Sequence, residues 1–195
     1  MEQSTLIPFV RENLDVLFIG LNPAKGSSQN RHYFSVNQSF WNQLFESGLI
    51  ISPVEKSIAD EIVFGDTKIN FLGWSFGITD LVTEIAESDS RKIKPSNKDC
   101  ENLSKLIKIN SPKSAILLHK KVLRTFLRYA KAPLPASNSG YLGTIIPNCP
   151  TVFFNIAFPH GSSFPSKAIV EQYKQVKNYL EGANNPSGNA RDIIY

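Results

Sequence analysis

Short runs of apolar residues alternate along the chain with segments in which apolar residues recur every three or four positions. The continuous runs predict strands buried on both faces of a parallel sheet, because a strand with one wet face alternates polar and apolar residues. We expect strands at Leu14–Leu21, near Gly77–Leu81 together with a loop, at Ser114–Leu118 and at Thr151–Ala157. Tyr141–Ile146 leads into the last strand across Pro147–Pro150, which favours a hairpin.

The segments with helical spacing lie between these strands. Ser52 and Glu55 form a capping box with Pro53 at the first helical position, so a helix is expected from there towards Phe64. Ser96 with Asp99 opens another helix. Residues 22–36 and 86–95 show no period and are expected to be loops. Further helices are expected from about Asn37, with Phe40, Trp41, Leu44, Phe45 and Leu49 on the buried face, over residues 120–130, and from Ser166 onward.

Alternating strands and helices are typical of a single three-layer αβα domain with a mostly parallel central sheet, here of about four strands. We assign residues 1–182 to this α/β domain and residues 183–195 to a loose C-terminal tail. In such sheets ligands bind beyond the carboxyl ends of the strands. Two loops at that edge are candidates for chemistry: GLNPAKGSS, residues 20–28, and FPHGSSF, residues 158–164.

Composition narrows the class of protein further. The 195 residues, with a mass of 21.8 kDa, suit one domain, and no apolar run approaches the length of a membrane span. Glu2 stands where a signal peptide carries cations, so we expect a cytoplasmic protein, nucleoid-associated if bacterial. Cys100 and Cys149 are too few for an iron–sulfur cluster, and three scattered histidines favour neither a metal nor another cofactor.

The first candidate loop offers an amide side chain and a run of backbone N–H groups. It has neither the G-x-x-x-x-G-K-[ST] pattern of a P-loop nor the G-x-G-x-x-G pattern of a dinucleotide site. Asn22 directly follows the first strand and precedes Pro23, and the N–H groups from Ala24 to Ser28 could face an anion. The commoner role of an asparagine at a strand end is to close an Asx-turn.

Four motifs in order resemble the uracil-DNA glycosylase superfamily: GLNPAKGSS, HYFSVNQSFWNQLFESGLI, GITDLV and FPHGSSF. The closest branch is the mismatch-specific uracil/thymine-DNA glycosylases. That branch carries GINPG after its first strand, an aromatic before an N-x-FW helix, a G-x-T-x-LV segment, and NPSGLSR or a relative after its last strand. The similarity runs from about Asp15 to Leu180. It implies a monofunctional DNA glycosylase of base excision repair, which we expect to bind DNA as a monomer.

The resemblance also implies roles for the matching residues. Asn22 would position the attacking water through its side-chain carbonyl, and Phe34 would stack on the flipped base. The loop FPHGSSF would enter the duplex where the base leaves. Backbone contacts to the base edge would come from Gly20, Leu21 and Ala24, and contacts to the opposite base and phosphate from Gly161, Ser162 and Ser163.

Several positions depart from the family pattern. Ala24 replaces a glycine, and its small side chain leaves room for 5-substituted pyrimidines, which a bulky tyrosine excludes in strict uracil enzymes. Gln38 replaces the asparagine of the N-x-FW pattern. In the second loop, Phe158 replaces an asparagine or histidine, His160 a small residue, Ser162 the inserted leucine and Phe164 an arginine.

His160 and Phe164 each allow two interpretations. His160 could act catalytically by donating a hydrogen bond to a carbonyl of the base, or it could touch a phosphate at the surface. Phe164 could be a wedge that enters DNA, or it could pack over the last helix. We expect His32, in a polar loop, and His119, at the start of a helix, to be incidental.

Lys121, Arg124 and Arg128 are spaced to share one face of the helix over residues 120–130. With Lys120 and Lys131 they form a basic stripe on a chain of net charge +4 and pI near 9.0. A stripe of this kind is often only a solvated helix face. It also suits a DNA-binding surface, because Lys and Arg neutralise phosphates.

Three functions remain open at this point. The first is a DNA glycosylase acting on uracil, and on other damaged or mismatched pyrimidines opposite guanine. The second is a non-catalytic nucleic-acid-binding protein on the same fold, which the altered second loop supports. The third is a small-molecule hydrolase that uses His160 with Ser162 or Ser163, but the chain has neither a carboxylate motif to orient that histidine nor a nucleophile elbow.

Overall fold

A computed structural model describes residues 2–135, 140–161 and 163–183. Its centre is a five-stranded sheet in the order β3-β2-β5-β7-β6. Four of the strands are parallel: β2 (Val16–Gly20), β3 (Phe76–Asp80), β5 (Ser114–Leu117) and β7 (Val152–Asn155). The fifth strand, β6 (Gly140–Thr144), pairs antiparallel with β7 as the expected hairpin. The mostly parallel sheet is confirmed, with one strand more than expected.

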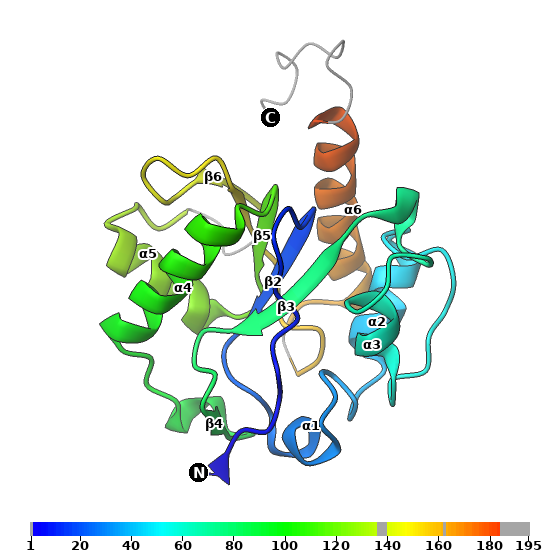
Figure 1. Ribbon diagram of the computed structural model, residues 1–195, viewed down its shortest axis with the longest axis horizontal. Helices are drawn as coiled ribbons and strands as arrows, with labels where there is room; N and C mark the ends of the chain where they lie inside the picture. The colour runs from blue at the N-terminus through cyan, green and yellow to red at the C-terminus, as the bar shows by residue number, and fades with distance from the viewer. Residues whose placement is uncertain (1, 136–139, 162, 184–195) are drawn as a thin grey trace.

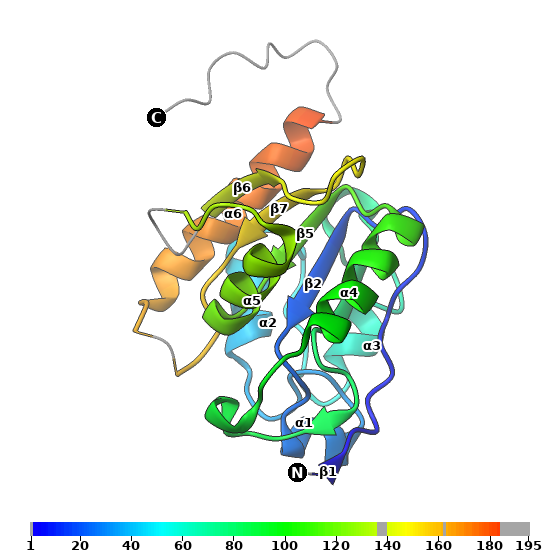
Figure 2. The same ribbon diagram turned by 90° about the vertical axis from the view of Figure 1, so that its left-hand side faces the viewer.

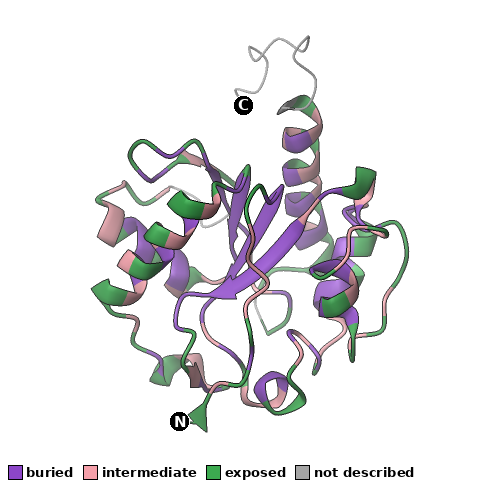
Figure 3. Ribbon diagram, in the orientation of Figure 1, coloured by how far each residue is buried: buried purple, intermediate pink, exposed green. Residues whose placement is uncertain are grey.

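Helices cover both faces of the sheet, which confirms the three-layer architecture (Figures 1 and 2). One face carries α4 (Asn97–Asn110) and α5 (Lys120–Ala130), and the other carries α2 (Ser39–Glu46), α3 (Ala59–Val63) and α6 (Ser166–Ala183). Successive residues of β2 face these two layers in turn: Phe18 packs with Phe40 of α2, whereas Leu17 and Ile19 pack in the cluster on the α4 and α5 side. Figure 3 shows the parallel strands buried throughout, which explains their continuous apolar sequences.

Three of the predicted helices are confirmed where the sequence placed them. Ser96 accepts a hydrogen bond from the Asp99 N–H while the Asp99 carboxylate accepts from the Ser96 N–H, so the capping box that starts α4 is present. The helix over residues 120–130 is α5, and the helix from Ser166 is α6. The inward residues of α6 are Ile169, Val170, Tyr173, Val176 and Leu180.

The capping box predicted at Ser52 is wrong, because α3 begins only at Ala59. The side chain of Gln38 binds the intervening segment instead. Its Nε2 donates to the Val54 carbonyl at 2.7 Å, and its Oε1 accepts from the Lys56 N–H at 3.1 Å. These two bonds hold residues 54–56 out of helical geometry, so a local capping pattern is overridden by a tertiary contact.

Other corrections concern segment boundaries and one buried face. Residues 22–36 are not all loop, since α1 (Lys25–Asn30) lies within them. Residues 86–95 include the short helix η2 (Ser90–Lys92), and the strand at Gly77 runs to Asp80 before any loop begins. Phe45, predicted on the buried face of α2, is 42% exposed. The tail expected over 183–195 lies outside the described residues, apart from Ala183 at the end of α6.

The loops expected to bind a ligand lie where the order of the parallel strands reverses. The chain passes from β2 to β3 on one side and later returns to β5 on the other side of β2. Such a reversal creates a crevice beyond the carboxyl ends of the two central strands. α1 and β4 (Ile85–Ala86), which pairs with β1 (Glu2–Gln3), lie beyond this end of the sheet (Figures 1 and 2). Within the described ranges, no helix is both long and apolar enough to cross a membrane.

Candidate active site

Asn22, two residues beyond β2, is fixed by its own side-chain amide. Its Nδ2 donates to the carbonyl oxygens of Pro23 at 2.8 Å, Glu87 at 2.9 Å and Ile85 at 3.3 Å. Because the NH2 group is turned to these carbonyls, the Oδ1 atom is turned away from them. The residue therefore presents an acceptor of fixed direction at the carboxyl end of β2.

The backbone on both sides of Asn22 is joined to the chain that follows β3. The carbonyl oxygen of Gly20 accepts from the Leu81 N–H at 2.9 Å, and that of Leu21 accepts from the Val82 N–H at 3.0 Å. The Pro23 carbonyl accepts from the Glu87 N–H at 3.0 Å. Gly20 and Leu21 are both buried. This ladder extends the pairing of β2 with β3 past the sheet, so the loop that carries Asn22 is held rigidly.

The N–H groups that follow Asn22 are partly used within the protein. Ala24 is exposed and precedes α1, whose Ser28 N–H donates to the Ala24 carbonyl at 2.9 Å. The Lys25 N–H donates to Ser88 Oγ at 3.3 Å. The anion site suggested for residues 24–28 therefore has two of its donors engaged in internal bonds.

Phe34 lies in the segment between α1 and α2 and stacks on the core. Its ring is parallel to that of Phe40, with 4.1 Å between the centroids and 19° between the planes. The Trp41 Nε1–H donates to the Phe34 carbonyl at 3.3 Å, and the Phe34 backbone has a φ of 52°. Left-handed backbone is unusual for a bulky residue and is retained only where the surroundings enforce it. Phe40 thus packs against one face of the Phe34 ring and holds it in place. We call this ring the stacking platform, because a base could stack on it.

Phe34 and aromatic side chains from two other loops form one cluster. The ring of Phe158, after β7, lies 6.1 Å from Phe34 and 6.0 Å from His119, which follows β5. His160 lies 5.1 Å from the same Phe158 ring. The structure therefore brings Phe34, His119 and His160 together around the ring of Phe158. His160 is exposed but its ring is partly desolvated, which lowers its pKa, so the imidazole is largely neutral at pH 7.

His119 was expected to be incidental, but it lies at this cluster. Its Nδ1 accepts from the Lys121 N–H at 3.0 Å and caps α5, so the ring proton is on Nε2. Burial, with a smaller effect of the Lys121 charge, lowers its pKa and keeps the ring neutral. The signal in the sequence was its place directly after a buried strand, the same signal that singled out Asn22.

His32 is also engaged rather than free. Its Nδ1 lies 2.8 Å from Oδ1 of the buried Asp60, whose Oδ2 accepts from the Tyr33 N–H at 2.7 Å. This carboxylate therefore orients His32 and fixes the backbone directly before Phe34. A lone histidine in a polar loop gave no indication of a carboxylate partner 28 positions later in the chain.

The second candidate loop is anchored at its two ends. Gln43 of α2 donates through Nε2 to the Pro159 carbonyl at 3.0 Å and to Ser166 Oγ at 3.2 Å. Gly161, with a φ of 68°, and Ser163 are exposed. Phe164 is 41% exposed, and both interpretations of its role stay open. Ser162 lies outside the described residues.

The basic stripe is divided by the structure. Arg124 and Arg128 are exposed on α5. Lys121 is not available in the same way, because its ammonium group donates to the carbonyl oxygens of Ser90 and Ile93 and ties η2 to α5. Within the described residues, Arg124 and Arg128, the other two cations proposed for DNA, have no such structural task.

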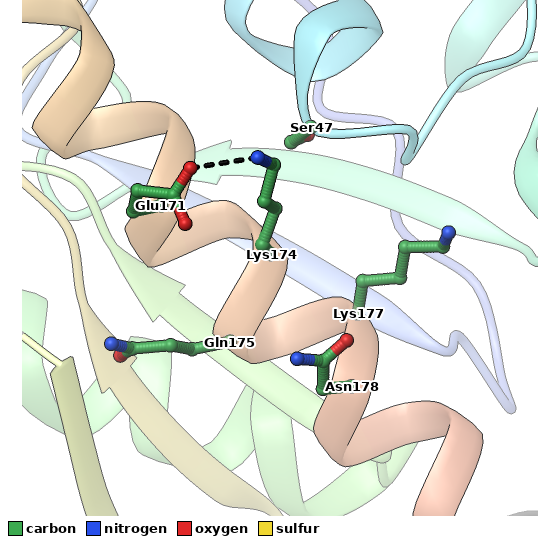
Figure 4. A pocket seen from close by; sticks show the side chains of 6 residues that line it. All are labelled: Ser47, Glu171, Lys174, Gln175, Lys177 and Asn178. Atoms are coloured by element: carbon green, nitrogen blue, oxygen red, sulfur yellow. Dashed lines mark hydrogen bonds and ion pairs between the residues drawn. The ribbon is translucent and has the colours of Figure 1, made fainter.

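Metal chemistry and surface pockets do not point to another site. The part of the chain that the structure describes contains no group of three or more His, Cys, Asp or Glu side chains that could hold a metal ion. One pocket lies between the end of α2 and α6 (Figure 4), and its Lys174 is paired with Glu171 at 2.7 Å. Another pocket lies at the turn between β6 and β7. Neither is lined by a residue of the candidate site.

Comparison with protein families matches residues 7–181 to the Uracil DNA glycosylase superfamily. The matched range contains both candidate loops, the central sheet and α6 almost to its end. A comparison with curated proteins found no match to the chain.

Proposed function

We propose that this chain, which belongs to the uracil DNA glycosylase superfamily, hydrolyses the N-glycosidic bond of uracil in DNA. The superfamily consists of DNA glycosylases, which are hydrolases of DNA repair. Within it, the four motifs favour the mismatch-specific uracil/thymine branch and a monofunctional enzyme. The observation that carries the proposal is the fixed amide of Asn22, whose Oδ1 is directed away from three carbonyl groups.

The proposed reaction needs a positioned water more than a strong base. As the bond between C1′ and the base breaks, the electron pair leaves with the base and positive charge develops on the sugar. An amide does not take up a proton near neutral pH, so Asn22 acts by accepting a hydrogen bond from the water that attacks C1′. The water loses its proton to solvent as the new C–O bond forms. Placement of groups that are already oriented supplies the rate increase.

The base must leave the duplex to reach this site, at a cost of about a few kcal/mol. Phe34 offers a supported aromatic face for it. The neutral rings of His119 and His160 add hydrogen-bond donors near the carboxyl ends of β5 and β7, where negative charge on the departing base would be stabilised. For His160 this supports the role at a base carbonyl over the phosphate contact.

Ala24 bears on the range of bases that the protein accepts. Its side chain is small and exposed, so pyrimidines with a 5-substituent are accepted as well as uracil. We further propose that the protein works as a monomer, in the cytoplasm and at the nucleoid if the source is bacterial.

A single assay tests the activity. A labelled duplex with one G·U, G·T, A·U or G·hypoxanthine pair is incubated with the protein and then treated with alkali, which breaks the strand at a site that has lost its base. We expect strand breaks with G·U. A lack of breaks in every duplex, at protein concentrations that saturate binding, contradicts the proposal.

A non-catalytic nucleic-acid-binding protein is the second candidate, and one observation favours it. The Phe158 ring, absent from the family pattern, lies 6.1 Å from Phe34 and takes space beside the platform. Tight binding to G·U duplexes without cleavage would support this function. Replacing Phe158 by Asn would then be expected to restore cleavage if only this ring blocks the site.

The exposed arginines of α5 are expected to contribute affinity for any DNA sequence. Binding of a cation to a phosphate releases counterions, so the slope of log K against log salt should become shallower by about 0.9 for each phosphate that is no longer neutralised. Replacing Arg124 and Arg128 together by Ala should flatten the slope and leave base preference unchanged. The matched control replaces Lys98 and Lys105 of α4, which removes the same charge from another helix. Equal slopes in the two double variants would show that the stripe is only a solvated face.

A further inference from the structure

Asp80 is a buried carboxyl group at the carboxyl end of the sheet that the proposed mechanism does not use. It is the last residue of β3 and lies in register with Gly20, the last residue of β2. The residue is only 7% exposed, and its Oδ2 has no hydrogen-bond partner among the described residues. An unpartnered buried oxygen is costly, and such atoms call for a physical explanation.

The position of this carboxyl is set by a glycine. A Cβ atom on Gly20 would lie 2.1 Å from Oδ1 of Asp80, so the side chain lies directly against the Gly20 backbone and a larger residue there would displace the carboxyl. Asp80 shares its sheet face with Ile78 and Phe76, which pack in the cluster that contains Tyr33 and Phe40. The carboxyl therefore lies on the Phe34 side of the sheet, two residues along the strand direction from Ile78.

An electrostatic effect of Asp80 on Tyr33 indicates that the carboxyl is near the segment that carries Phe34. Burial is the main cause that raises the pKa of Tyr33, and the charge of Asp80 is the next. Phe34 is the next residue in the chain. The Asp80 side chain thus lies against Gly20 through Oδ1 and near Tyr33, while its Oδ2 has no partner among the described residues.

We propose that the Asp80 carboxyl reads the hydrogen-bonding edge of the base bound at this site, pairing with an edge that presents a ring N–H beside a carbonyl oxygen. This inference rests on the proposed function, because that function is what brings a base to the site. A protonated carboxyl offers one O–H donor and one acceptor oxygen side by side. This arrangement matches uracil, thymine and hypoxanthine, which all carry such an edge. The substrate class is therefore defined by the N–H and carbonyl pair rather than by the pyrimidine ring.

The environment of Asp80 favours the protonated form. Burial raises its pKa to about 8, and no cation of the described chain acts on it to reverse the effect; Tyr33 is its titratable neighbour there. At pH 7 the group is therefore largely neutral. An ionised carboxylate would lack the donor and would repel the negative charge on the departing base, so protonation suits both binding and bond cleavage.

Two substitutions separate this role from a purely structural one. Asp80→Asn keeps a donor and an acceptor on the same edge and cannot ionise. Asp80→Leu fills a similar volume without either. Binding of free uracil, measured by calorimetry at pH 7, should be close to wild type for Asp80→Asn and weaker by about tenfold or more for Asp80→Leu, the effect of losing a pair of hydrogen bonds. Wild type should also bind 3-methyluracil, which lacks the ring N–H, more weakly than uracil.

The pH dependence of uracil affinity separates the proposed role from a packing role, because a residue that only packs would not change it. Between about pH 7 and pH 9.5, wild type should lose affinity for uracil relative to Asp80→Asn, because only wild type loses its donor; ionisation of uracil itself affects both proteins equally. The folded state holds the proton more tightly than the unfolded chain, so the cost of this burial grows as the pH rises from about 4 to about 8. The Tm of Asp80→Asn should accordingly exceed that of wild type increasingly over this range.

The outcomes keep this inference apart from the proposed function. Equal uracil affinity in wild type and a folded Asp80→Leu would overturn the role of Asp80, whatever the cleavage assay shows. Parallel pH profiles for wild type and Asp80→Asn would overturn it as well. Absence of cleavage by wild type would overturn the proposed function alone, since uracil binding needs neither DNA nor catalysis.

Discussion

Asn22→Ala should cleave a G·U duplex about 10²-fold more slowly than wild type under single-turnover conditions, with DNA affinity nearly unchanged. The magnitude is that of a well-placed group acting on proton transfer or water orientation. The reason lies in the orientation of the amide, whose Nδ2 is committed to the Pro23, Ile85 and Glu87 carbonyls while Oδ1 is left to hold a water. A loss confined to the chemical step distinguishes this role from binding.

The same amide also ties two loops together, so the experiment needs a control for loop anchoring. Ser88→Ala removes the acceptor for the Lys25 N–H, at 3.3 Å, and loosens the same pair of segments without changing Asn22. This variant should cleave at close to the wild-type rate. Asn22→Asp keeps acceptor oxygens but loses the Nδ2 donors, so its activity reports how much the acceptor contributes by itself. Wild-type cleavage by a folded Asn22→Ala protein would remove the basis of the enzymatic proposal.

Phe34→Ala should weaken binding to a uracil-containing duplex by about 1–3 kcal/mol, the usual loss when an aromatic partner of a stacked base is removed. Binding to an undamaged duplex should change little, because no base is extruded there. The comparison is made by fluorescence anisotropy in the Asn22→Ala background, so that the substrate stays intact. Its structural basis is the Phe34 ring, stacked on Phe40 at 4.1 Å and held at a positive φ.

Phe34→Leu separates the platform from the packing. Leucine keeps apolar contact with Phe40 but has no aromatic face, so it should preserve most of the stability and still lose affinity for the uracil duplex. Phe34→Ala should also lower the Tm. The loss in free energy of unfolding should be smaller than the about 3–5 kcal/mol lost when a fully buried phenylalanine is replaced by alanine. If the leucine variant binds the uracil duplex as wild type does, Phe34 is a packing residue and not a platform.

Much of the architecture was predictable because burial on both faces of the sheet leaves a local pattern. The apolar runs of β2, β5 and β7 indicated parallel strands, and the spacing of α4, α5 and α6 indicated their inward faces. The resemblance of the motifs located Asn22 and Phe34, and the family comparison confirms the superfamily. Their catalytic and stacking roles stay predictions.

Local patterns failed where a distant residue decides the backbone. The capping box at Ser52 is overruled by Gln38, which binds residues 54 and 56 from another segment. Lys121 is predicted as a surface cation, but it holds the Ser90 and Ile93 carbonyls. In both cases the competing hydrogen bond comes from a residue at least 16 positions away, which no periodicity records.

The sequence by itself therefore determined the order of the parallel strands and the longer helices, most of their buried faces and the residues that follow the central strands. Only the tertiary structure decided which contacts those residues make, and therefore how their side chains are oriented and protonated. It turned the Asn22 amide by binding it to three carbonyls, and it set the tautomer of His119 through a helix cap. It placed Asp80 against Gly20 without a partner for Oδ2 among the described residues. Side-chain direction and protonation depend on neighbours across the sheet, and those neighbours are adjacent only once the chain has folded.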